Sequence, residues 1–134
     1  MALSSDRKTP RRSGDTRVFG VAAGAAIHAG ALTCINSSGY AVPGSVSTAL
    51  KAVGRACESE DNASGANGVR SVRVETGIFR FNNSAAADEI TAADISADCF
   101  VVDDETVAKT NGSSTRSVAG KVFDVDDQGV WVQF

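Results

Sequence analysis

Alternation of apolar and polar residues is the main pattern along this chain, and it predicts strands. In the clearest stretch, Val72 and Val74 face one side while Arg73 and Glu75 face the other. Apolar residues recur at Phe79 and Phe81, but the phase has slipped by one residue. A slip at a glycine predicts a β-bulge at Thr76-Gly77, which would keep all four apolar side chains on one core. We expect residues 72–81 to form the centre of the sheet.

Other segments have the same short, β-branched or alternating character between turn-forming residues. They predict strands at residues 17–21, 26–36, 40–42, 50–57, 100–102, 106–108, 117–125 and 130–134. The polar segment Glu58–Gly68 predicts a loop, and Asp103–Glu105 predicts a hairpin turn. Thr91 and Asp94 have capping-box spacing, which predicts one short helical turn.

These elements together predict an all-β fold. The many alanines would favour helices, but no long segment keeps the helical spacing of apolar residues. We expect a small β-barrel or sandwich of about seven to nine short strands. Residues 1–17 are polar and include a proline and a glycine, so we expect an extended N-terminal arm. Residues 18–134 form the predicted single β domain.

Composition agrees with one globular domain. The chain has 134 residues, of which 43% are hydrophobic and 22% charged, as in ordinary globular proteins. It contains no run of 18 apolar residues and begins without the apolar segment of a signal peptide. We therefore expect no membrane partner and synthesis in a reducing cytoplasm.

Charge is distributed unevenly between the arm and the body. Residues 1–17 hold five basic and two acidic residues, a net charge of +3, whereas the remaining residues have a net charge of −6. An acidic body argues against direct binding to nucleic acid. The arm itself would suit a phosphate or an acidic protein surface, or it is a tail without a partner.

No pattern predicts catalysis, a metal or a cofactor. The only histidine, His28, has no nucleophile motif beside it, and Cys34, Cys57 and Cys99 lack zinc-ligand spacing, which favours three buried thiols. Two acidic groups, one at 103–105 and one around Asp124-Val125-Asp126-Asp127, suit solvated turns better than a calcium site. We therefore predict that the protein is not an enzyme.

Several stretches of the chain resemble the head decoration, or cement, proteins of tailed bacteriophages. They cover nearly the whole sequence in order and include the arm Ser5–Asp15 and the segments 28–44, 74–84, 90–110, 115–125 and 129–132. His28 departs from the pattern, where an aromatic tyrosine is expected. No single motif is diagnostic, and the resemblance is carried by the ordered combination.

The resemblance implies a structural virion protein made in the host bacterial cytoplasm. Such a protein binds the outer surface of the capsid and cements neighbouring major capsid protein subunits, which stabilises the DNA-filled head. The implied partners are the major capsid protein and further copies of the chain, as a homotrimer rather than a dimer. Neither catalysis nor a cofactor is implied.

The arm is the predicted capsid-binding element, since an extended basic segment can add main-chain hydrogen bonds and ion pairs to a partner. The residues proposed for this contact are Asp6, Arg7, Thr9, Pro10, Arg11, Arg12 and Asp15. Trp131 is a second candidate, because an outward tryptophan often marks an interface; the alternative is that it lies flat on its own sheet or under the arm. Tyr40 is a third.

Other functions stay open on sequence alone. The polar loop Glu58–Gly68 would suit a capsid-displayed module that adheres to the host surface. A free carbohydrate- or calcium-dependent binding domain is another alternative, although one Trp and one Tyr offer little aromatic surface. A small hydrolase that uses His28 and a nearby carboxylate is the last.

Overall fold

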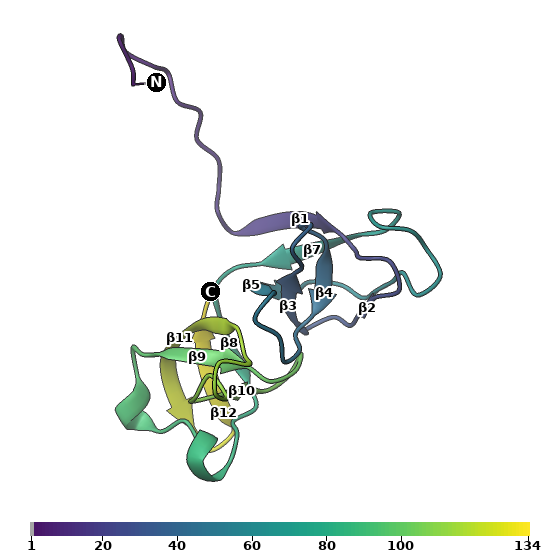
Figure 1. The fold of residues 1–134 in the computed structure, drawn as a ribbon. Coiled ribbons are helices and arrows are strands. Elements are labelled where there is room, and N and C mark those ends of the chain that lie inside the picture. Colours follow the sequence, from purple (N-terminus) through teal and green to yellow (C-terminus); the bar gives the residue numbers. More distant parts are fainter. Residues whose placement is uncertain (1) are drawn as a thin grey trace.

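The computed structural model describes residues 2–134 and confirms the all-β class (Figure 1). Two five-stranded antiparallel sheets and one two-stranded sheet contain all the strands. The strands are β1 (Thr16–Gly20), β2 (Ala26–Ile27), β3 (Leu32–Ile35), β4 (Ala41–Pro43), β5 (Lys51–Ala56), β6 (Glu60–Asp61), β7 (Ser71–Glu75), β8 (Ile78–Phe81), β9 (Asp98–Val101), β10 (Val107–Ala108), β11 (Val118–Asp126) and β12 (Gly129–Gln133).

More strands form within residues 2–134 than the seven to nine that we predicted. The predicted strand 26–36 is interrupted at Gly30, which has a φ of +89°, and becomes β2 and β3. The predicted loop Glu58–Gly68 contributes β6, which pairs with β2. Asn62 holds the rest of this loop, because its buried side-chain amide donates hydrogen bonds to the Val21, Ala22 and Ala66 carbonyls.

The first sheet has the strand order β1-β7-β5-β3-β4, and the second has the order β10-β9-β11-β12-β8. In Figure 1 the first sheet lies next to the arm, and the second lies at the opposite end of the body. The hairpin predicted around Asp103–Glu105 is confirmed, since β9 and β10 pair antiparallel.

The predicted bulge at Thr76-Gly77 is wrong. The chain leaves the first sheet after β7 and enters the second sheet at β8, so the phase slip marks a crossing between sheets. Gly77 permits the crossing with a φ of +149°. Residues 72–81 are not one central strand, because β8 is the outermost strand of its sheet.

The interior contains two apolar clusters. The first includes Val72 and Val74, and the second includes Phe81, so the residues expected on one core belong to two. Leu32 and Cys34 lie on β3 of the first sheet but pack in the second cluster. The side chains of β3 therefore link the two sheets through buried contacts.

Two 3-10 turns, η1 (Ala86–Asp88) and η2 (Ala92–Asp94), lie between β8 and β9, where we predicted one. The capping box is confirmed: the Asp94 carboxylate accepts hydrogen bonds from the Thr91 backbone N–H and hydroxyl. Ile90, between the turns, is 1% exposed and anchors both to the second cluster.

Candidate interaction surfaces

The N-terminal arm projects away from the body (Figure 1). Residues 2–15 are all exposed, and β1 begins at Thr16, two residues before the boundary that we predicted. Arg17 belongs to the sheet, because its guanidinium donates to the Val53 carbonyl over 3.0 Å. The arm is fastened at its base, where Thr76 donates hydrogen bonds to the carbonyls of Gly14 and Asp15.

The predicted arm residues lie in a row along this extended segment. Their side-chain hydrogen bonds are local: Arg7 donates to Thr9, and Ser13 donates to Asp15, both over 3.1 Å. The structure brings none of these side chains together into a site on the body. It leaves Arg11 and Arg12 exposed to solvent, as a contact with another molecule requires.

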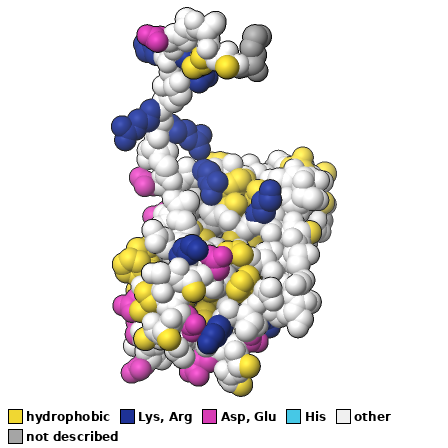
Figure 2. All heavy atoms as spheres, turned by 60° about the vertical axis from the view of Figure 1, so that its left-hand side comes forward, with side chains coloured by type: hydrophobic (Ala, Val, Ile, Leu, Met, Phe, Trp, Pro, Cys, Tyr) yellow, Lys and Arg dark blue, Asp and Glu magenta, His cyan; other side chains and the backbone are white. Residues whose placement is uncertain are grey.

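Charge separates within the body as well. Residues 18–77 hold four basic and four acidic residues, whereas residues 78–134 hold four basic and ten acidic residues. The second sheet and its connections therefore carry a net charge of −6, whereas the first sheet and its connections, with Arg17 of β1 included, carry a net charge of +1. Figure 2 shows basic side chains along the arm and acidic side chains gathered at the far end of the body.

Trp131 lies half-buried on the outer face of the second sheet, beside solvent and not under the arm. Its indole N–H donates to the Asp126 carboxylate over 2.8 Å, and the Arg80 guanidinium lies 5.5 Å from the ring centroid. Together with Ile78, Phe123 and Asp124 it lines an open groove of about 440 Å³. We call these four residues the aromatic groove.

Phe123 and Asp124 share the outer face of the second sheet because of a β-bulge that we did not predict. Val122 pairs with Val132 and Asp124 pairs with Trp131, so Phe123 is the extra residue on β11. A bulge turns two successive side chains toward the same face. Phe123 is 53% exposed, and Asp124 is exposed as well, although strict alternation would turn it inward. The adjacent apolar residues Val122 and Phe123, followed by Val125, were the sequence signal for this slip.

Tyr40 packs on glycines of the first sheet and its loop. Its ring carbons lie 3.3 to 3.4 Å from the positions that a Cβ would take on Gly20 and Gly68. The two glycines therefore leave room for the half-buried ring. This contact gives Tyr40 a packing role, and its proposed interface role stays a prediction.

The histidine and cysteines do not form a cluster. His28 is exposed and lines a groove of about 270 Å³ with Asp104 and Glu105. Cys34 and Cys99 are buried, and burial raises their pKa values to about 12 and about 11. Cys57 is half-buried, follows β5 and lies beside the Glu75 carboxylate at 3.9 Å.

The acidic turns are organised by hydrogen bonds. Asp126 accepts from the Trp131 indole and from the Gln128 and Gly129 backbone N–H groups, and these bonds hold its pKa below the usual value. Asp103 accepts from the Glu105 backbone N–H. Within residues 2–134, no group of three or more potential metal-ligating side chains comes together.

A groove of about 710 Å³ lies between the 3-10 turns and the β11–β12 turn. Asn83 in its wall is bonded internally, because its amide exchanges hydrogen bonds with the Ile90 backbone. Its lining combines these amides with carboxylates of Glu89, Asp126 and Asp127. No aromatic side chain is part of that lining in the described chain, so it lacks the platform that sugars prefer.

Comparison with known proteins returned no match: no family model, no curated protein and no solved structure is similar to this chain. In the part of the chain that the structure describes, no helix has the length and apolar character needed to cross a bilayer.

Proposed function

We propose that this protein is a structural virion protein that binds the exterior of a tailed-phage capsid and cements neighbouring major capsid protein subunits. The single observation that carries the proposal is the free basic arm on a compact acidic β body. The sequence resemblance supplies the identity of the partner.

The arm has the properties of an attachment device. Residues 2–15 carry four basic and two acidic side chains, and their hydrogen bonds are local above the base. Pro10 restricts the backbone to extended conformations, which reduces the entropy lost on binding. Such a segment can lie across a capsid subunit, pair its backbone with an exposed strand and place Arg11 and Arg12 near carboxylates.

The body supplies rigidity. Leu32 and Cys34 of β3 in the first sheet pack into the same buried cluster as the second sheet, so force on one sheet is transmitted to the other. A cement protein gains avidity when each oligomer grips several subunits, by about 10²–10⁴ over one contact. A homotrimer would hold three arms and therefore needs only modest affinity in each.

Co-sedimentation tests the proposal. The purified protein is mixed with mature heads of the phage that encodes it, stripped of decoration, and the pellet is quantified by densitometry. We expect saturation at a fixed ratio to the major capsid protein. No binding by the folded protein would overturn the proposal.

Arm variants locate the contact. We expect R11A/R12A to weaken head binding, and we expect the charge-matched control K51A/R73A, which alters exposed first-sheet residues, to bind as the parent does. Removal of residues 2–13 should weaken binding further with an unchanged circular dichroism spectrum, because β1 begins later. Salt should weaken binding only in part, since it screens charges but not main-chain or apolar contacts. Equal binding by all variants would exclude the arm as the capsid-binding element.

A further inference from the structure

The aromatic groove is an exposed surface, and none of its four residues belongs to either buried apolar cluster. A bulge places Phe123 and Asp124 on the same outer face, and Ile78 and Phe123 are 38% and 53% exposed. Asp124 lines the groove, and Asp126 lies at its rim on the Trp131 indole. Exposed aromatic side chains beside carboxylates suit an extended cationic ligand, whose arginines pair with the acids and stack on the rings.

The chain contains one segment of that chemistry, the arm. Lys8-Thr9-Pro10-Arg11-Arg12 joins three cationic side chains and a proline, and prolines in extended segments dock on aromatic grooves. The charges are complementary, because residues 2–15 carry a net charge of +2 and residues 78–134 a net charge of −6. We propose that the aromatic groove is a self-association site that receives the N-terminal arm of a second copy of this chain.

The arm's length fits this contact. Arg12 and Lys8 lie two and six residues beyond the fastened Gly14, so an extended chain carries them about 7 to 22 Å from the base. This reach is enough for the cationic segment to contact a neighbouring body that lies beside the base of the arm.

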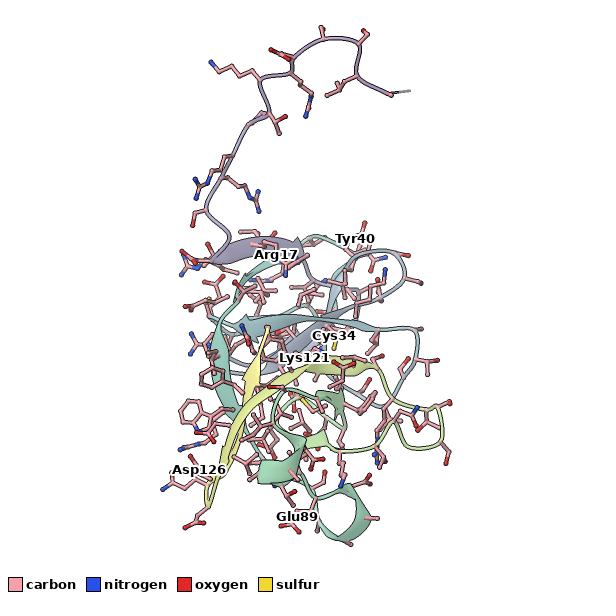
Figure 3. All side chains as sticks on the ribbon, turned by 90° about the vertical axis from the view of Figure 1, so that its left-hand side faces the viewer. Arg17, Cys34, Tyr40, Glu89, Lys121 and Asp126 are labelled. Atoms are coloured by element: carbon pink, nitrogen blue, oxygen red, sulfur yellow. The ribbon has the colours of Figure 1, made fainter. Side chains whose placement is uncertain are left out.

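The base of the arm favours a second copy over the arm's own body. Thr76 donates hydrogen bonds to the Gly14 and Asp15 carbonyls. From there the arm runs in the direction opposite to the second sheet (Figure 3). To reach its own groove, the chain would have to reverse at this fastened base. A neighbouring groove can be reached without breaking these hydrogen bonds.

This inference goes beyond the proposed function, since it concerns the purified protein without capsid. In the free protein the arm rests on a second copy, and a capsid competes for it. Arm exchange of this kind is heterologous: each copy gives an arm and receives one, which closes into a ring or extends as a chain.

Full-length protein gives the first test. Trp131 is the only tryptophan, so its emission reports on the groove. At low salt, we expect average mass in sedimentation velocity to rise with concentration, with a matching blue shift of the emission. R11A/R12A and F123A should each weaken association about tenfold or more. V46A removes an equally exposed apolar side chain elsewhere and should associate as the parent does.

Mixing variants gives the decisive test. R11A/R12A keeps an intact groove, and F123A keeps an intact arm, so a mixture of the two should form one-to-one pairs that neither forms alone. Failure of the two variants to pair would overturn the proposal, and so would a parent protein that stays monomeric at every concentration. An emission shift that depends on the arm but not on concentration would also overturn it, because the arm would then dock on its own body. Because no capsid is present, this failure is distinguishable from failure of capsid binding.

Discussion

The two five-stranded sheets have the same architecture but opposite electrostatic character. The first sheet and its connections, within residues 16–77, carry a net charge of +1, and the second, within residues 78–134, carries a net charge of −6. Both are built from alternating residues around buried valines. The comparison shows that alternation determines the fold, whereas the outward-facing positions remain free to carry charge for association.

The largest expected effect tests whether the two sheets fold as one unit. Leu32 lies on the first sheet but is fully buried in the second cluster. We expect Leu32→Ala to lower the free energy of unfolding by about 2–5 kcal/mol through lost burial and a cavity. Urea denaturation followed by Trp131 emission and by circular dichroism should give one coincident transition. Separate transitions would mean that the sheets unfold independently.

A second prediction concerns the turn of the second sheet. Gly129 has a φ of +153°, and a Cβ there would clash with the Phe81 carbonyl oxygen. We expect Gly129→Ala to destabilise the fold by about 1–3 kcal/mol. Gly14→Ala is the control, since its Cβ would meet nothing within 4 Å. Equal melting temperatures for the two variants would contradict the strain argument.

Acidification should lower the stability of the folded state through carboxylates in the second sheet and its connections. Hydrogen bonds from Thr110, Thr91 and Trp131 lower the pKa values of Asp88, Asp94 and Asp126, respectively. A lowered pKa stabilises the folded state at neutral pH, and this contribution disappears as pH falls below about 4. The urea midpoint should drop less on acidification for Asp126→Asn than for Asp127→Asn, which alters a neighbouring exposed carboxylate. An equal drop would exclude this role of Asp126.

The smallest expected effect is a difference in reactivity among the three thiols, with no change in stability. Cys34 and Cys99 are buried, with raised pKa values, whereas Cys57 is half-buried. We expect an aromatic disulfide reagent to modify one thiol in the native protein and three in urea. Cys57→Ala should abolish the native reaction. Fast modification of all three without denaturant would mean that the interior opens readily.

The sequence predicted the fold class and most strands because alternation is a local signal. It also located the capping box at Thr91 and the hairpin after β9. It failed at Thr76-Gly77, since a phase slip has the same appearance whether a strand bulges or the chain changes sheets. Only long-range pairing, of β7 with β1 and of β8 with β12, distinguishes the two.

Among the candidate surfaces, too, the sequence predicted those that depend on local patterns and missed the one that depends on long-range pairing. The arm was evident from composition, and the outward position of Trp131 followed from alternation in the last strand. The aromatic groove could not be predicted from the sequence, because Ile78, Phe123 and Trp131 come from three strands that pairing brings together. The bulge at Phe123 left a weak signal in two adjacent apolar residues, which becomes interpretable only once the register of β11 and β12 is known.

The fastening of the arm at Thr76 has a mechanical consequence. Thr76 belongs to the crossing between the sheets, and β1 pairs with β7 through five residue pairs from Thr16–Glu75 to Gly20–Ser71. Tension applied along β1 would load these pairs together in shear, whereas tension applied across it would open them one at a time from Thr16. The direction from which the arm is pulled therefore decides how much load the protein bears before its first strand detaches.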